Sequence, residues 1–248
     1  LEEAIAGRIA EDPSQRMVWW GGSWWSGGEF DRRTAECETL LREAGFQPGS
    51  RLAAFLPNSP LVLLLSVAAW RLGGTFVPLN PRGGEEWILR ILEHLDPFAV
   101  ILGEGSEALA EPIRSIGAPV STAPVDGLPR PFTGRRDRTA QDPEVAVIFA
   151  TSGTTGAPKA VPLTHENLYD NTMGVHRTIE GFERGRVLMN ILPNFHSFGY
   201  TVCGVLPLVW GLPEALLPAF LPLKNLFDGL RESGTGILIA VPTMLPFI

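Results

Sequence analysis

Residues 51–78 read RLAAFLPNSPLVLLLSVAAWRLGGTFVP, and this stretch decides the fold. A short apolar run at 51–55 is followed by a longer one at 61–72 and a second short one at 75–78, with Pro or Gly at each junction. Run lengths of this kind predict a strand, a helix and a strand. Short apolar strands that alternate with helices indicate βαβ crossovers and a mostly parallel sheet.

The same alternation continues downstream with a predicted helix at 85–95, whose large apolar residues share one face, and a strand at 98–102. Upstream, the sequence predicts a helix that ends at Ala10, and then an aromatic hairpin with strands at 17–20 and 24–25. The four tryptophans of this hairpin serve either as a stacking platform for a ligand base or, as is commoner for buried rings, as core packing. Asp31 is the predicted cap of the next helix.

We therefore expect an α/β fold of layered, mostly parallel sheets flanked by helices. The expected segments are 1–50 (N-terminal helix, aromatic hairpin and capped helix), 51–141 (a βα subdomain) and 142–248 (a βα segment with two unusual loops). The alternative is a single large domain in which these segments interleave.

Residues 118–142 interrupt the pattern with proline-rich sequence that carries Arg130, Arg135, Arg136 and Arg138. A solvated loop is the expected structure, because charge runs between elements usually face water. Docking of an acidic partner or a phosphorylated carrier is the alternative.

Composition excludes several classes of protein. With 248 residues, of which 45% are hydrophobic and 19% charged, the chain can bury a core without disulfide or metal staples. Its formal net charge of −7 argues against a nucleic-acid partner. Cys37 and Cys203 imply no disulfide framework and fit reduced thiols in a cytoplasmic protein.

Targeting and membrane segments are not expected either. The first residues lack the basic region of a signal peptide. The apolar region 187–223 is interrupted by five prolines, so no transmembrane segment is predicted, although peripheral membrane contact stays open.

The first unusual loop follows the buried strand predicted at 145–150 and reads TSGTTGAPK, residues 151–159. Glycines let backbone N–H groups turn toward one point, hydroxyls add donors and a lysine adds charge, and together these form a nest for phosphate oxygens. The spacing is not that of a Walker A loop. Thr164 is the predicted cap of the following helix. The candidate phosphate ligands are Thr151, Ser152, Gly153, Thr154, Thr155, Gly156 and Lys159.

The second unusual loop follows the strand predicted at 187–192 and reads PNFHSFG, residues 193–199. Ligands of parallel sheets bind beyond the carboxyl ends of the strands, so we expect both loops to border one cleft. An imidazole can donate a hydrogen bond to a carboxylate, and the neighbouring rings suit an apolar tail. The candidate substrate residues are Phe195, His196, Phe198 and Gly199.

Other chemistries lack their motifs. The helix that begins His165-Glu166 has no second histidine at zincin spacing, and the scattered His and Cys residues predict no metal cluster. No Gly-x-Ser-x-Gly surrounds Ser152, which argues against a hydrolase nucleophile.

Residues 151–167, TSGTTGAPKAVPLTHEN, resemble the phosphate loop and following helix start of the adenylate-forming superfamily. This superfamily comprises acyl- and aryl-CoA synthetases, luciferases and peptide-synthetase adenylation domains. Residues 192–199, LPNFHSFG, resemble the next motif of the superfamily, in the form found among fatty acyl-CoA and acyl-carrier-protein synthetases. The two motifs occur in the family's order, and the likeness covers essentially the whole chain.

The resemblance implies that a carboxylate, most simply of a fatty acid, attacks the α-phosphorus of Mg²⁺·ATP and forms acyl-AMP and pyrophosphate. A thiol of CoA or of a phosphopantetheine carrier, such as acyl carrier protein, would then take the acyl group. The loop at 151–159 would hold the β- and γ-phosphates, with Lys159 as a catalytic cation. His196, the second implied catalytic residue, and its aromatic neighbours would border the carboxylate and the acyl entrance.

The chain also departs from the family pattern. Ala160 stands where the family often has glycine, and the family's later motifs, including those of its C-terminal lid domain, are missing. We therefore expect an N-terminal portion of a synthetase that does not complete turnover alone. The alternative is a non-catalytic nucleotide- or acyl-binding module derived from such an enzyme. A kinase-like NTPase is disfavoured because no magnesium-binding Asp/Asn set is recognisable.

Overall fold

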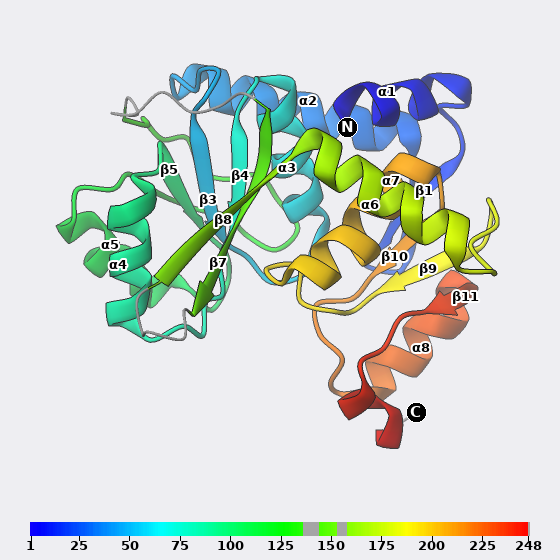
Figure 1. Cartoon of the computed structure of the whole chain (residues 1–248). Coiled ribbons are helices and arrows are strands. Elements are labelled where there is room, and N and C mark those ends of the chain that lie inside the picture. The colour runs from blue at the N-terminus through cyan, green and yellow to red at the C-terminus, as the bar shows by residue number, and fades with distance from the viewer. Residues whose placement is uncertain (136–143, 153–157, 248) are drawn as a thin grey trace. The chain divides into compact units, whose positions relative to one another are not determined.

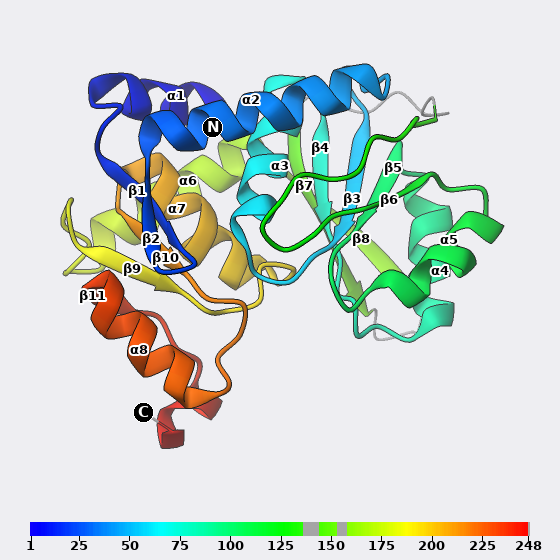
Figure 2. The ribbon, with the colours of Figure 1, turned by 180° about the vertical axis from the view of Figure 1, so that it is seen from behind.

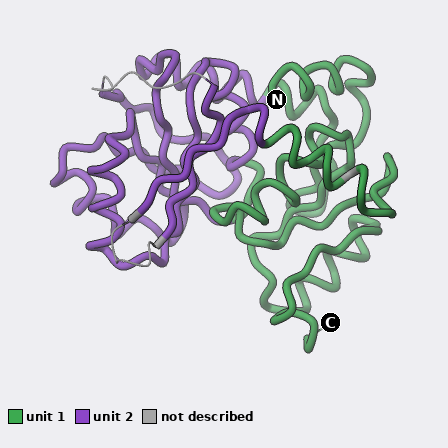
Figure 3. The backbone as a smooth tube through the Cα atoms, in the orientation of Figure 1, with its two compact units in different colours: residues 1–32, 58–60, 168–248 green, residues 33–57, 61–167 purple. Residues whose placement is uncertain are grey.

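The computed structural model describes residues 1–135, 144–152 and 158–247, and these form two compact units that interleave along the chain (Figure 3). Unit 1 comprises 1–32, 58–60 and 168–248, and unit 2 comprises 33–57 and 61–167. Residues from both ends of the chain meet in unit 1 because the N-terminal hairpin pairs with a strand near the C-terminus. The three consecutive segments expected from the sequence stay a prediction about domain boundaries.

Unit 2 contains a sheet whose described strands follow the order β6-β5-β3-β4-β7-β8. All neighbours run parallel except β7 and β8. From β3 the chain passes to β4 on one side and then crosses back to β5 on the other, so the two connecting helices cover opposite faces (Figures 1 and 2). The strands are β3 (Arg51–Phe55), β4 (Thr75–Pro78), β5 (Ala99–Leu102), β6 (Val120–Thr122), β7 (Val145–Ser152) and β8 (Pro158–Thr164).

The helices of unit 2 include the two connections that the sequence predicted. Helix α4 (Glu85–Leu95) has the predicted bounds, and its apolar stripe is buried with Phe55 and Leu102 in one core cluster. Helix α3 (Pro60–Arg71) contacts β7 through the indole N–H of Trp70, which donates to the Ala146 carbonyl at 2.8 Å. The short elements η1 (Glu107–Leu109) and α5 (Ala110–Ser115) were not predicted, because they are too short to show a periodic pattern.

Arg135 corrects the expectation of a solvated loop after β6. Its guanidinium pairs with Asp96 and donates to the carbonyls of Pro97 and Gly117, both at 3.1 Å. The side chain therefore fastens this segment to unit 2, while Arg130 is exposed as expected. Arg136 and Arg138 lie outside the described residues.

Unit 1 contains a second sheet, whose described strands follow the order β11-β9-β10-β1-β2. The predicted hairpin is confirmed, with Trp19 opposite Trp24, and β2 is the antiparallel edge strand of an otherwise parallel sheet. Trp19 is buried and Trp24 packs against the same core, which favours packing over a stacking platform. The strands are β1 (Arg16–Trp20), β2 (Ser23–Ser26), β9 (Val187–Asn190), β10 (Glu214–Leu216) and β11 (Thr235–Leu238).

Of two helix caps predicted from the sequence, one is wrong and one is confirmed. Helix α2 begins at Gly27, because the Glu29 N–H donates to Ser26 Oγ at 3.1 Å, so the prediction of Asp31 as its cap is wrong. Thr164 does cap the helix that follows β8, since its Oγ1 accepts the Asn167 N–H at 3.1 Å. The remaining helices are α1 (Glu2–Glu11), α2 (Gly27–Glu43), α6 (His165–Thr178), η2 (Gly199–Val205), α7 (Leu206–Trp210), α8 (Leu223–Ser233) and η3 (Pro242–Phe247).

None of the helices in the described part of the chain combines the length and the apolarity needed to cross a bilayer.

Candidate active site

The first predicted loop connects two paired strands of unit 2. Strand β7 is buried over its apolar part and continues through Thr151 and Ser152, and β8 begins at Pro158 and runs back along it. Thr151 is the register partner of Lys159, so the two ends of the loop lie side by side. The loop is therefore shorter than the predicted 151–159.

The pairing of β7 with β8 was missed in the sequence, because Pro158 and Pro162 argue against a strand. Proline is compatible with an edge strand, and β8 occupies the edge of the sheet. The side chain of Lys159 is exposed at its start. Gly153, Thr154, Thr155 and Gly156 lie outside the described residues, so the phosphate nest stays a prediction.

The second predicted loop connects β9 to η2 in unit 1. The His196 N–H donates to the Pro193 carbonyl at 3.0 Å, and the His196 carbonyl accepts the Tyr200 N–H at 2.9 Å. Because its backbone groups are satisfied internally, the residue is fixed while its imidazole is exposed. The imidazole lies 4.6 Å from the Phe195 ring, centroid to centroid, and Phe198 is 49% exposed.

Gly199 closes this loop for a steric reason. A Cβ atom at this position would lie 2.5 Å from the Pro193 carbonyl oxygen and 3.0 Å from that of Leu192. The chain can therefore return to η2 this closely only where no side chain is present. Gly199 shapes the loop, while Phe195, His196 and Phe198 supply its accessible groups.

A buried polar cluster that no sequence pattern indicated lies under the second loop. Asn190 Nδ2 donates to Glu214 Oε1 at 2.7 Å, and the amides of Asn190 and Asn194 exchange two hydrogen bonds of 3.2 Å. The Asn194 N–H donates to Asn58 Oδ1 at 2.9 Å, and Asn58 Nδ2 donates to the Leu192 carbonyl at 2.7 Å. All four side chains are buried. We call Asn58, Asn190, Asn194 and Glu214 the polar cluster.

Glu214 is the one ionisable member of the polar cluster. Burial raises the pKa of its carboxyl group well above the ordinary value of 4.5, and the hydrogen bond from Asn190 offsets only part of this shift. Its Oε2 atom has no hydrogen-bond partner among the described residues. Burial also raises the pKa of the Cys203 thiol, and a negative charge on Glu214 would add to that shift.

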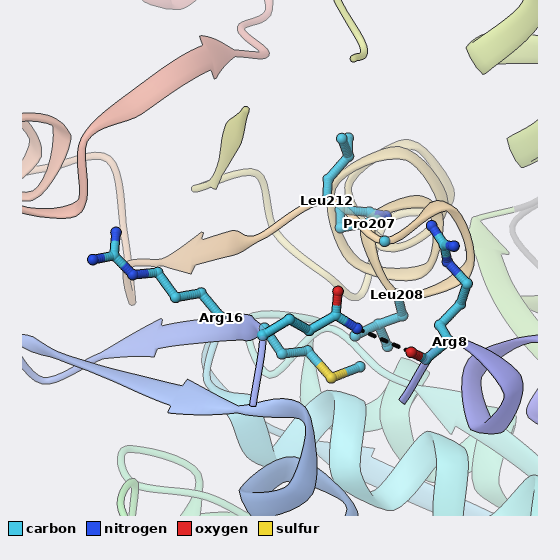
Figure 4. Close-up of a pocket in the computed structure, with 8 residues that line it drawn as sticks. Arg8, Arg16, Pro207, Leu208 and Leu212 are labelled. Atoms are coloured by element: carbon cyan, nitrogen blue, oxygen red, sulfur yellow. Dashed lines mark hydrogen bonds between the residues drawn. The ribbon is translucent and has the colours of Figure 1, made fainter. Parts of the chain in front are cut away.

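A small pocket between α1, β1 and α7 includes none of the predicted site residues (Figure 4). Gln15 Nε2 donates to the Arg8 carbonyl at 3.0 Å, and the Arg8 guanidinium binds Glu11 and the Trp210 carbonyl. Arg16 extends away from Arg8 and lies over the Trp24 ring. Because its cations already have partners, this pocket is a packing feature of unit 1.

The described residues bring each predicted loop to the end of a buried strand. The loop after β7 belongs to unit 2, and the loop after β9 belongs to unit 1. That both loops border one cleft stays a prediction.

Solved structures share this architecture. The ATP-bound crystal structure of MatB from Rhodopseudomonas palustris matches with a TM-score of 0.80 and 26% identity, over 99% of this chain and 50% of that one. The N-terminal domain of FACL13 from Mycobacterium tuberculosis matches with a TM-score of 0.85 and 23% identity, over 99% of this chain and 64% of that one. The fold, mostly parallel sheets flanked by helices, is therefore that of the N-terminal domains of adenylate-forming enzymes.

Sequence comparisons show the family to which the chain belongs. The long-chain-fatty-acid–CoA ligase FadD13 of Mycobacterium tuberculosis is 31% identical over 221 residues, which are 86% of this chain and 43% of that protein. A feruloyl-CoA synthase of an Amycolatopsis species is 30% identical over 245 residues, which are 96% of this chain and 48% of that protein. Residues 5–248 match the family model "AMP-binding enzyme", and the chain belongs to this family. It spans about half the length of these curated relatives.

Proposed function

We propose that the protein activates a carboxylic acid with ATP and transfers the acyl group to a thiol. The observation that carries this proposal is the string TSGTTGAPK at the end of the buried strand β7, in a chain that belongs to the AMP-binding enzyme family. The names of its relatives, CoA ligases for long-chain fatty acids and for ferulate, support the reaction type.

In the first step of the proposed reaction, a carboxylate oxygen attacks the α-phosphorus of Mg²⁺·ATP. The bond from this phosphorus to the oxygen that bridges to the β-phosphorus breaks, and pyrophosphate leaves with the electron pair. Negative charge builds on that leaving group, so fixed donors around the β- and γ-phosphates lower the barrier. We assign this role to residues 151–156 and to Lys159, whose ammonium group adds a charge-assisted contact.

In the second step, a thiolate attacks the acyl carbon and AMP leaves as the thioester forms, the thiol proton having passed to a base or to water. The acceptor is CoA, as the names of the relatives suggest, or a phosphopantetheine group on a carrier protein. Buried free thiols at Cys37 and Cys203 fit a reducing compartment, and on this ground we place the reaction in the cytoplasm.

We assign recognition of the acid to the loop after β9. The imidazole of His196 is exposed on a fixed backbone and can donate a hydrogen bond to the carboxylate. The Phe195 ring lies beside it, and Phe198 adds an exposed ring to the same loop, and such rings suit an apolar acyl chain. This arrangement supports a fatty or similarly apolar acid as the substrate.

The test is pyrophosphate–ATP exchange with the intact protein over a panel of acids of increasing chain length. Exchange that depends on an added acid, and is fastest with an apolar one, is the expected result. Separate reactions with CoA and with a phosphopantetheinylated carrier protein then identify the acceptor. ATP binding without acid-dependent exchange would instead support a non-catalytic module.

A further inference from the structure

We propose that Glu214 is a positioning residue for acid recognition, because the polar cluster connects it to the loop that presents His196. This inference rests on the proposed function, in which His196 meets the substrate carboxylate. Glu214 lies in β10, outside both predicted loops in the sequence, and its side chain is fully buried.

The hydrogen bonds run without interruption from β10 to the loop. Glu214 accepts from Asn190 at the end of β9, and Asn190 binds Asn194 through both atoms of its amide. Asn194 stands two residues before His196, inside the turn in which the His196 N–H donates to the Pro193 carbonyl. A displacement of Asn194 therefore shifts the imidazole, since the intervening backbone is closed by its own hydrogen bond.

Asn58 fixes the same turn from a distant part of the chain. Its amide accepts the Asn194 N–H at 2.9 Å and donates to the Leu192 carbonyl at 2.7 Å, so it holds the backbone on both sides of Pro193. With Asn58 as one support and Glu214 as the other, Asn194 is held through its backbone and its side chain. A cluster with this many constraints defines one loop conformation.

Burial in the polar cluster favours the neutral form of Glu214, because it raises the pKa of the carboxyl group. The neighbouring strands place the apolar residues Val18 and Leu188 in register with it, and the titratable group coupled to it among the described residues is the Cys203 thiol on η2. A buried carboxylate with an unpartnered Oε2 atom costs more free energy than the protonated acid. Glutamine keeps a neutral side chain with an acceptor for Asn190, while valine removes that acceptor.

The experiment compares Glu214→Gln, Glu214→Val and the control Ile5→Ala in the intact protein. Ile5 is a fully buried residue of α1 in the same unit and lies outside the core cluster that contains Ile191 and Leu192, so its truncation reports the effect of destabilisation. Two readouts are used: hydrogen–deuterium exchange of peptides that cover 191–200, and the KM values for acid and for ATP in pyrophosphate exchange.

We expect Glu214→Val to speed hydrogen exchange in 191–200 and to raise the KM for the acid roughly 10-fold, with the KM for ATP within about 2-fold of the parent. Glu214→Gln should retain the parent values in both readouts. Ile5→Ala should change neither the exchange of 191–200 nor the ratio of the two KM values.

Unchanged hydrogen exchange in Glu214→Val, or an equal change in Ile5→Ala, would overturn the inference whatever reaction the protein catalyses. Faster hydrogen exchange with an unchanged KM for the acid would overturn the role in acid recognition, because Glu214 would then hold a loop that does not bind the acid. The proposed function itself fails separately, if the parent protein shows no acid-dependent pyrophosphate exchange.

Discussion

Lys159 supplies the positive charge of the predicted phosphate nest, and its side chain is exposed at the start of β8. Replacing it with alanine removes a charge-assisted contact to the triphosphate, so we expect ATP binding to weaken roughly 10-fold to 100-fold. Isothermal titration with ATP measures this. Lys224→Ala, which removes an equally exposed lysine on α8, is the control and should leave ATP affinity unchanged. Equal affinities of Lys159→Ala and the parent would contradict the assigned role.

His196 is exposed with its backbone fixed, so its substitution tests the imidazole itself. We expect His196→Ala to raise the KM for the acid roughly 10-fold, because a hydrogen bond to a charged carboxylate is lost, while the KM for ATP changes little. Steady-state pyrophosphate exchange gives both constants. His94→Ala removes an exposed histidine on α4 and serves as the control. A larger change in the KM for ATP than for the acid would refute the assignment.

At the scale of elements, the loop after β9 depends on the close return of the chain at Gly199. The Cβ of Gly199→Ala would overlap the Pro193 carbonyl, so we expect a loss of about 1 to 3 kcal/mol in the free energy of unfolding. Urea unfolding measures this loss. Gly174→Ala is the matched control: its Cβ meets nothing within 4 Å in helix α6, and it should be neutral or stabilising. Equal stabilities of the two variants would contradict the steric argument.

The strand β10 carries a buried acid whose protonation is coupled to folding. Because the pKa of Glu214 is raised in the folded state, the unfolded chain releases this proton first, and the free energy of unfolding falls as pH rises above about 4.5. Glu214→Gln has no such proton. We therefore expect the stability difference, variant minus parent, to grow with pH by up to about 1.4 kcal/mol per pH unit below the folded-state pKa. Urea unfolding at several pH values tests this, and parallel pH profiles would disprove it.

At the scale of the molecule, each compact unit contains one buried thiol, Cys203 in unit 1 and Cys37 in unit 2. Burial raises the pKa of Cys37 to about 12 and also raises that of Cys203. The lower thiolate fraction is partly offset by the greater nucleophilicity of a thiolate of higher pKa, so we expect Cys37 in the folded protein to react at least about 30-fold more slowly with thiol reagents than in denaturant. Each of the single variants Cys37→Ala and Cys203→Ala retains one thiol, so mass spectrometry of its labelling reports the local unfolding of one unit. Fast labelling of either thiol without denaturant would show that its unit is not closed.

The sequence by itself determined the elements whose pattern is local. The strand at 51–55, the helix at 85–95 and the cap at Thr164 follow from periodicity and capping within one short window, and the two loop motifs are strings of neighbours. Family membership also followed from those strings. The same local patterns mispredicted the start of α2. Two glycines follow Ser26, and glycine is a poor helix former, so Ser26 was not recognised as the cap.

Only the tertiary structure decided which distant residues meet. The Asn58 and Asn194 groups that share a hydrogen bond are 136 residues apart, and Asn190 and Glu214 meet because β9 and β10 are neighbours in a sheet. No single strand pattern records its partner, since side-chain alternation fixes a face but not a neighbour. In the sequence, Glu214 is therefore only an acidic residue within an apolar strand. Its hydrogen bond to Asn190 can be recognised only when the pairing of the strands is known.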